Sequence, residues 1–208
     1  MTDTAADRTT QKTLDKVASF YDGRKVGDVG PLGFRRSTDI ATLGNCIAVM
    51  MDEGLLRPGE SSFLDLGCAD GRVNVFMSYL VKISAGIEMD ELTLEEYEPL
   101  KQELEEALKA HKLKVPPENI FLFPGDALDS QTHMAIRDSA DFDLSDFDLF
   151  YTYLIMHEEF SRLVLKKAKR GAIFMVYGLD RIMPRYKGLR LIEKLSPLEG
   201  ILALYRKI

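Results

Sequence analysis

The sequence has few of the side chains that bind metal ions or form disulfides. It holds two cysteines and three histidines in 208 residues. Two isolated cysteines do not make a disulfide framework, and neither Cys46 nor Cys68 has a histidine or cysteine at metal-ligand spacing. We therefore expect no disulfide and no metal site, and we expect Cys68 to have a structural role.

Long apolar runs are also absent. Every hydrophobic stretch either has the length of a strand or is broken by charge, and the first residues lack the apolar core of a signal peptide. The composition, 46% hydrophobic and 29% charged, is sufficient for a hydrophobic core. These properties predict one globular domain in the cytoplasm, without a membrane partner.

Excess basic charge is missing as well. The formal net charge is −6, whereas proteins that bind nucleic acid backbones present clustered lysine and arginine. Nucleic acid is therefore not the expected partner, although a local basic patch stays open.

What the sequence does contain is a turn bracketed by glycines after an apolar segment. Residues 62–72 read Ser-Phe-Leu-Asp-Leu-Gly-Cys-Ala-Asp-Gly-Arg, and residues 86–88, Gly-Ile-Glu, end a second apolar segment in a carboxylate. In doubly wound α/β sheets, such a turn holds a nucleoside and such a carboxylate binds ribose hydroxyls. The two segments predict a nucleoside site.

The charges around the turn indicate which nucleoside is bound. A dinucleotide loop needs G-x-G-x-x-G, but Ala69 and Arg72 occupy the second and third glycine positions. Asp65, Asp70 and Glu88 would also repel a pyrophosphate. S-adenosylmethionine (SAM) has no phosphate and carries a sulfonium and an ammonium, which favour acidic surroundings. The turn therefore favours SAM over NAD.

Three segments together resemble the class I SAM-dependent methyltransferases: residues 65–72, residues 86–88, and residues 123–127, which read Phe-Pro-Gly-Asp-Ala. The resemblance covers roughly residues 36–208 and implies SAM as cofactor and S-adenosyl-L-homocysteine as product. In that family the turn approaches the methionine moiety, the Glu88 position takes the ribose hydroxyls and the Asp126 position meets the adenine amino group. The positions implied to bind the cofactor are Asp65, Gly67, Cys68, Ala69, Gly71, Glu88, Met89, Asp126, Ala127 and Tyr151. One departure is Ala69, where glycine is commoner and where alanine needs an allowed φ.

The pattern of apolar residues predicts alternating strands and helices. We expect a helix from an N-cap at Ser37, Thr38 or Asp39 to near Gly54, and an acidic loop between Asp126 and residue 147. The other predicted elements are strands near 62–66, 83–88, 120–123, 147–153 and 172–177, helices over 73–80, 91–112 and 157–168, and closing strands at 189–195 and 201–206. A closing antiparallel hairpin is typical of class I methyltransferases. The resemblance implies a doubly wound α/β fold with a seven-stranded, mostly parallel sheet of order 3-2-1-4-5-7-6.

The N-terminal part differs from the rest. A short helical stripe near Tyr21 is followed by a glycine-rich segment from Gly23 to Gly33. We interpret residues 1–35 as a flexible arm that could close as a lid, together with Phe34-Arg35-Arg36, and residues 36–208 as the SAM-binding domain. A plain connector is the alternative.

The methyl acceptor is less clear from sequence. An Asn-Pro-Pro-Tyr or Asp-Pro-Pro-Tyr motif is absent, and the matching stretch 151–154 reads Tyr-Thr-Tyr-Leu, which tells against amino-methylation of adenine, cytosine or glutamine amide. A weaker resemblance to small non-SET lysine methyltransferases makes a protein lysine one candidate acceptor. Tyr151, and less strongly Tyr153, could hold its ammonium by a cation–π contact. His157 is the one histidine placed to act as a general base.

We therefore predict an enzyme, a SAM-dependent methyltransferase that moves the sulfonium methyl group to a nucleophilic nitrogen or oxygen. A protein or a small metabolite could supply the acceptor atom. The alternatives are a SAM-binding module that has lost turnover, and another nucleoside enzyme on the same sheet, such as an aminopropyl transferase or an NAD enzyme.

Overall fold

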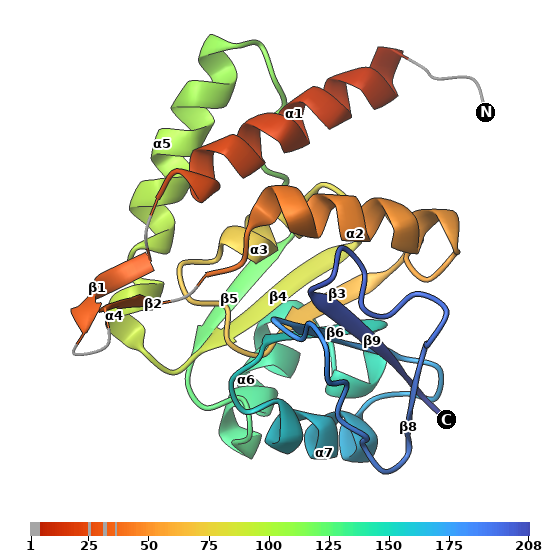
Figure 1. Cartoon of the computed structure of the whole chain (residues 1–208). Coiled ribbons are helices and arrows are strands. Elements are labelled where there is room, and N and C mark those ends of the chain that lie inside the picture. The colour runs from red at the N-terminus through yellow and green to blue at the C-terminus, as the bar shows by residue number, and fades with distance from the viewer. Residues whose placement is uncertain (1–4, 25, 31–32, 36) are drawn as a thin grey trace.

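The computed structural model describes residues 5–24, 26–30, 33–35 and 37–208. It has three layers, with a central sheet between two layers of helices (Figure 1). One layer holds α2 (Ile40–Asp52), α3 (Arg72–Ser78) and α5 (Tyr97–Ala110), and the other holds α6 (Ser130–Ala140) and α7 (His157–Lys167). The first helix, α1 (Ala5–Asp22), packs on the outer side of α2, α3 and α5.

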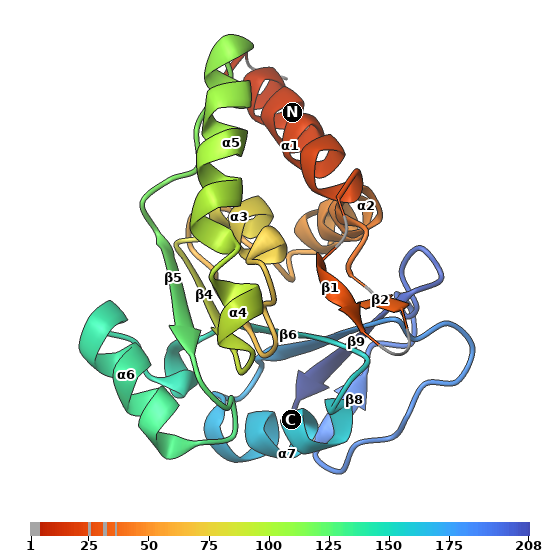
Figure 2. The same ribbon diagram turned by 90° about the vertical axis from the view of Figure 1, so that its left-hand side faces the viewer.

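The sheet confirms the predicted topology. Its strands, in spatial order, are β5 (Ile120–Pro124), β4 (Ile83–Glu88), β3 (Ser62–Asp65), β6 (Leu149–Tyr153), β7 (Ile173–Tyr177), β9 (Leu202–Lys207) and β8 (Leu189–Leu191). This is the order 3-2-1-4-5-7-6, with β9 antiparallel to both of its neighbours. A separate pair, β1 (Val26–Gly30) and β2 (Gly33–Arg35), lies near the short helix α4 (Glu91–Leu94) (Figure 2).

The register of the parallel strands aligns their carboxyl ends. Asp65 at the end of β3 pairs with Gly86 on one side and with Tyr151 on the other. Glu88 pairs with Pro124, and Tyr153 with Tyr177. The segments that follow β3, β4, β5, β6 and β7 therefore meet along one edge of the sheet, which is where ligands bind in open α/β sheets.

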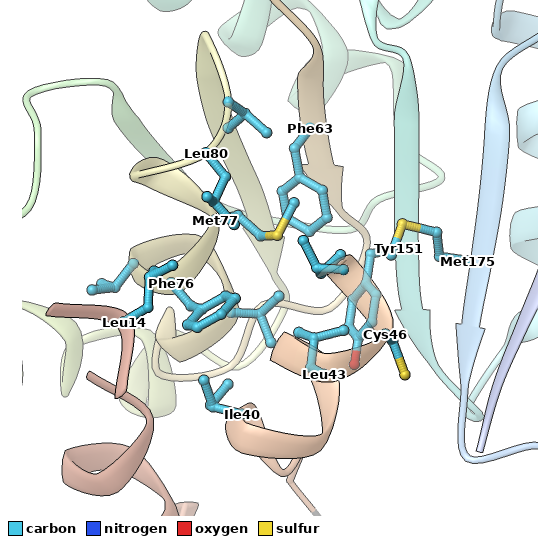
Figure 3. Close-up of a cluster of buried hydrophobic side chains, with 14 of the residues drawn as sticks. Leu14, Ile40, Leu43, Cys46, Phe63, Phe76, Met77, Leu80, Tyr151 and Met175 are labelled. Atoms are coloured by element: carbon cyan, nitrogen blue, oxygen red, sulfur yellow. The ribbon is translucent and has the colours of Figure 1, made fainter. Parts of the chain in front are cut away.

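The core lies on both faces of the sheet. Every residue of β3 is buried, as expected for a central parallel strand. On the face toward α2, Leu43, Phe63 and Phe76 belong to one apolar cluster that Leu14 of α1 also joins (Figure 3). A second cluster on the other face packs α6 and α7 against the sheet. None of the helices in the described ranges is long and apolar enough to cross a membrane.

The helix predicted at 91–112 is two helices in the structure. α4 ends at Leu94 and α5 begins at Tyr97. Pro99 explains the break, because its ring would clash with the carbonyl of Glu95 in a continuous helix, whereas proline is tolerated in a first turn.

The prediction of an acidic loop after Asp126 is wrong, because this segment contains α6 and a single 3₁₀ turn at Leu144–Asp146. Asp129 caps α6 by accepting a hydrogen bond from the Gln131 amide at 2.9 Å. Thr132 and Ile136, four residues apart, bury one face of the helix.

The predicted N-terminal stripe is part of α1. Leu14, Val17, Ala18 and Tyr21 are all buried. Pro31 and Arg36 of the predicted lid lie outside the described residues. The division into an arm, residues 1–35, and a SAM-binding domain, residues 36–208, stays a prediction.

A buried ion pair fixes the start of α3. The guanidinium of Arg72 lies 2.9 Å from the Asp70 carboxylate, and both side chains are almost fully buried, 4% and 0% exposed. The same guanidinium donates hydrogen bonds to the Tyr21 carbonyl at 3.3 Å and to the Ser37 hydroxyl at 3.1 Å. Arg72 therefore connects the turn after β3 to the end of α1 and to the segment before α2.

The start of α2 has two caps. Asp39 accepts from the Thr42 amide at 2.7 Å, which confirms the predicted N-cap. Asp22, at the end of α1, accepts from the Ile40 and Ala41 amides at 2.7 and 3.0 Å. These bonds satisfy amides that an isolated helix leaves unpaired, and they fix α1 against α2.

We expect Arg72→Met to lower the free energy of unfolding by about 3–5 kcal/mol, because it leaves the Asp70 carboxylate buried without its cation. Urea unfolding followed by circular dichroism measures the change. The double variant Asp70→Asn/Arg72→Met should recover part of the loss. Equal stability of Arg72→Met and the unmodified protein would contradict a structural role for the pair.

Candidate functional site

The turn between β3 and α3 depends on two glycines that are closely packed. Gly71 has a φ of 74°, and a Cβ there would lie 2.7 Å from the Tyr97 ring. A Cβ at Gly86 would lie 2.7 Å from both Asn74 Oδ1 and Cys68 Cβ. Glycine at these positions lets the turn and β4 approach each other closely.

Gly67 is different. Its φ is outside the left-handed range, and a Cβ built on it meets no atom within 4 Å. Among the glycines of residues 37–208, this combination occurs at Gly67 alone. Neither backbone conformation nor packing requires glycine there, and the space beside it opens to a cavity.

The cavity lies at the carboxyl edge of β3 and β6 and has a volume of about 50 Å³. It brings together five of the predicted cofactor residues: Asp65, Gly67, Cys68, Ala69 and Tyr151. Its other lining residues are Val26, Ser37, Thr38, Arg72, Val73 and Tyr153. A cavity of this volume accommodates a small polar group. The predicted residues Gly71, Glu88, Met89, Asp126 and Ala127 lie outside its lining.

Asp65 is the most unusual group in this cavity. Its side chain is 1% exposed, and its Oδ1 atom has no hydrogen-bond partner in the described part of the chain. Burial, and to a lesser degree the nearby Glu88 charge, raises the pKa of Asp65 well above its usual value, although a hydrogen bond from the Gly67 amide opposes this shift. A buried carboxylate oxygen without a partner is costly, and such groups concentrate at binding sites.

Glu88 is held against the turn by backbone amides. Its two carboxylate oxygens accept hydrogen bonds from Ala69 and Asp90, each at 2.9 Å. Ala69 adopts a left-handed φ of 49°, which explains why glycine would be easier at this position. The Gly125 amide donates to the Glu88 carbonyl at 2.9 Å and so joins the end of β5 to the end of β4.

The predicted adenine contacts follow β5. Asp126 is exposed, and its carboxylate accepts from the Leu128 amide at 2.8 Å. Ala127 is buried, whereas Met89, after β4, is 68% exposed. These residues border the open side of the turn, next to Glu88.

Cys68 is buried below the turn. Its amide donates to the Ile87 carbonyl at 2.9 Å, which pairs the turn with β4. Burial raises the pKa of the Cys68 thiol well above its usual value, so it is a neutral thiol at neutral pH. The expected structural role agrees with this placement.

The two tyrosines of β6 share one face of the sheet. Residues two apart on a strand point the same way, and both Tyr151 and Tyr153 line the cavity. The Tyr151 ring packs in the core near Leu43 and Cys46 (Figure 3), and its hydroxyl lies 2.5 Å from the Thr38 hydroxyl. Burial raises the pKa of Tyr151 well above its usual value, so Tyr151 is a neutral hydrogen-bonding group. Tyr153 is partly exposed and is better placed to touch an acceptor.

His157 lies elsewhere. Its Nδ1 atom is 2.6 Å from the Tyr186 hydroxyl, and Tyr186 packs against Phe174 and Tyr205 in the cluster on the opposite face of the sheet. His157 is not among the residues that line the cavity. The structure therefore does not bring His157 and Tyr151 together, and the base role stays a prediction that this placement does not favour.

Sequence patterns missed several cavity residues. Thr38 and Ser37 stood out as candidate helix caps, and Val26 and Val73 carry no chemical signal of their own. Arg72 was noted because it does not fit a dinucleotide loop. Its pairing with Asp70, two residues away, was the signal that could have indicated a buried anchor.

No family model and no curated protein matches the chain. Solved structures do resemble it. The tRNA methyltransferase TrmI from Aquifex aeolicus is 14% identical with a TM-score of 0.52, over 94% of this chain and 76% of that one. A conserved hypothetical protein from Streptococcus pyogenes is 13% identical with a TM-score of 0.50, over 77% and 94%. An RNA methyltransferase from Salinibacter ruber, in complex with S-adenosyl-L-homocysteine, is 17% identical with a TM-score of 0.49, over 83% and 92%.

Identities this low show the fold and nothing finer. The sheet order, the turn after β3 and the carboxylate at the end of β4 agree with that likeness. The chain has the Rossmann-like fold of the class I SAM-dependent methyltransferases.

Proposed function

We propose that the protein is a SAM-dependent methyltransferase that moves the sulfonium methyl group to a nucleophilic nitrogen or oxygen. The observation that carries the proposal is the pairing of Asp65 with Gly67. One provides a buried carboxylate oxygen without a partner, and the other leaves open space beside it. An ammonium group satisfies both features, and SAM carries one at its methionine end.

Different residues around the turn are suited to bind different parts of SAM. Asp65 would accept from the ammonium, since a charge-assisted hydrogen bond would satisfy its Oδ1 atom. Glu88 would take the ribose hydroxyls and Asp126 the adenine amino group, along the open side of the turn. The cavity, which Asp65 and Gly67 line, suits the methionine end. When bound, SAM supplies a methyl group that is already activated by the sulfonium.

The chain's own contribution to the reaction is alignment and exclusion of water. With SAM bound, the lone pair of the acceptor atom would form a bond to the methyl carbon as the carbon–sulfur bond breaks, and that bond's electron pair would stay on sulfur. The acceptor also loses one proton, to solvent or to a base. Tyr153, partly exposed beside the cavity, is placed to contact the incoming group.

A protein lysine is one candidate acceptor, because Tyr153 could hold an ammonium before deprotonation. A small metabolite is the alternative. A SAM-binding module without turnover is a further alternative, but the residues of the turn are intact. Nucleic acid and membranes are not the expected partners.

Gly67→Ala should separate binding from stability. We expect this variant to be as stable as the unmodified protein or up to about 1 kcal/mol more stable, because its φ is allowed and its Cβ meets nothing. Its affinity for SAM should fall by about tenfold or more, since the methyl group occupies the space beside Asp65. Chemical unfolding and titration calorimetry measure the two effects.

Gly71→Ala is the matched control. Its left-handed φ and its contact with Tyr97 predict a loss of roughly 2 kcal/mol or more of stability. If Gly67→Ala bound SAM normally, the cavity would not be the cofactor site.

Asp65→Asn should have opposite effects on stability and on binding. In the folded protein the pKa of Asp65 is raised, so the folded state holds this proton more tightly than the unfolded chain. The stability that this bound proton contributes is fully present below the usual pKa of a carboxyl group. It is lost as the pH rises through the pKa that Asp65 has in the folded state. At a pH above this folded pKa the unmodified protein contains a buried carboxylate that the variant lacks, so there we expect the variant to unfold at a higher temperature without SAM.

The same substitution should weaken SAM binding by about tenfold or more, because the ammonium loses its charged partner. In the unmodified protein, affinity should decrease as the pH falls through the raised pKa of Asp65, because Asp65 then takes up a proton. Calorimetric titration at a series of pH values tests the expectation. An unchanged affinity in Asp65→Asn would remove Asp65 from the site.

Transfer of radiolabelled methyl groups from SAM into a cell lysate tests the activity itself. We expect label in the protein fraction, and no label with Glu88→Ala, because loss of the ribose-binding carboxylate removes cofactor affinity. Label in the small-molecule fraction would establish metabolite methylation instead. Measurable SAM binding without label in any fraction would identify a module without turnover.

A further inference from the structure

Exposed apolar side chains gather at the carboxyl edge of the sheet. Within the described residues, nine large hydrophobic side chains are exposed. Six of them lie in the segments that follow β4, β5, β6 and β7: Met89, Leu92, Leu128, Ile155, Met156 and Ile182. Ile155, Leu92 and Ile182 are the most open, at 74%, 77% and 83% exposure. Because the register aligns these strand ends, the six side chains border the same edge as the cavity.

The same segments are acidic. We call residues 88–92, 125–129, 154–159 and 178–185 the edge segments. They contain eight carboxylates and two arginines, and six of these carboxylates remain when Glu88 and Asp126, which are assigned to SAM, are set aside. Glu91, Asp129, Glu158 and Asp180 are exposed to solvent. The edge therefore combines apolar side chains with excess negative charge.

We propose that the edge segments form the docking surface for a protein methyl acceptor, and that the docked segment carries lysine or arginine together with apolar side chains. This proposal rests on the proposed function, because the cavity beside the edge must supply the methyl group. Charge complementarity selects a cationic segment, and Ile155 and Leu92 provide contact area for apolar side chains. From β5 to β7 the edge spans roughly 19 Å, which is about six residues of extended chain.

The charge of the edge disfavours two other occupants. Phosphates of a nucleic acid would meet carboxylates instead of the lysines and arginines that neutralise them. A second copy of this chain, docked by the same patch, would place two acidic surfaces against each other. A cationic segment is also attracted before contact, so the association rate should depend on ionic strength.

Three synthetic peptides test the chemistry of the docked segment. Each holds one lysine as acceptor: the first is flanked by arginine and leucine, the second by glutamate and leucine, and the third by arginine and serine. Label is transferred from radiolabelled SAM at saturating SAM concentration. We expect kcat/KM to be at least about tenfold higher for the first peptide than for the second, and several-fold higher than for the third. Raising the salt from about 50 mM to about 300 mM should reduce the first value. Equal values for the three peptides would overturn the proposal.

Substitutions in the edge segments test whether the peptide docks there. Glu91→Gln/Glu158→Gln and, separately, Ile155→Ser should raise KM for the first peptide about three- to tenfold, with kcat and SAM affinity unchanged. These side chains lie outside the cavity lining. The matched controls are Glu118→Gln and Ile208→Ser, which alter an exposed carboxylate and an exposed isoleucine away from the edge. Changes in KM of equal size in the controls would contradict docking at this edge.

The outcomes separate this proposal from the proposed function. SAM binding with label in RNA or in small molecules alone would leave the methyltransferase function standing and overturn the protein-docking surface. Self-association that Ile155→Ser abolishes, measured by sedimentation, would show that the edge is an interface between copies. Absence of SAM binding would overturn the proposed function, and the docking proposal with it.

Discussion

The buried pair of Asp70 and Arg72 holds together the parts on which the site depends. The pair lies at the start of α3, directly after the turn. From there the guanidinium donates to the Tyr21 carbonyl in the last turn of α1 and to the hydroxyl of Ser37. Thr38, the next residue, contacts the Tyr151 hydroxyl under the cavity. Two segments that are distant in sequence thus form one wall of the cavity, and a single guanidinium spans the distance between them.

Asp70 and Asp65 lie close together in the chain and are both buried, but their surroundings give them different roles. Asp70 has a structural role, and Asp65 has a binding role in the proposed function. Asp70 is fully buried and paired with a cation, so its charge is compensated within the chain. Asp65 is equally buried, but one of its oxygens has no partner in the described residues. Burial raises the pKa of Asp65, which means that its ionised form is unfavourable without a ligand. A chain selected for stability alone would have no reason to keep an ionisable group there, whereas a cationic ligand gives it one.

The sequence predicted the features that depend on local pattern and on turn chemistry. The sheet order was implied by the resemblance to class I methyltransferases, with which the closing hairpin agrees, and Asp39 was found among the candidate caps because its side chain suits that role. One helix was predicted over residues 91–112, but Pro99 lies in the first turn of α5, where a second helix begins. The cavity walls were not predictable, since Val26 and Thr38 reach the site through packing of α1 and α2, and no local pattern encodes that contact. His157 shows the same limit: its position after β6 suggested the site, but its ring pairs with Tyr186 on the other face.

Fold likeness leaves the acceptor undetermined, because one fold serves many chemistries. TrmI from Aquifex aeolicus acts on tRNA, yet its likeness to this chain is one of backbone arrangement at 14% identity. The acceptor must instead be inferred from the surface it would touch. A site for RNA needs cations around the reacting atom to neutralise phosphates, and here the edge segments contain eight carboxylates against two arginines. The same carboxylates lower the energy of a nearby lysine ammonium, and the apolar side chains among them remain exposed without a partner in the described chain. Both properties favour an amphipathic cationic protein segment over RNA, even on a fold that RNA methyltransferases share.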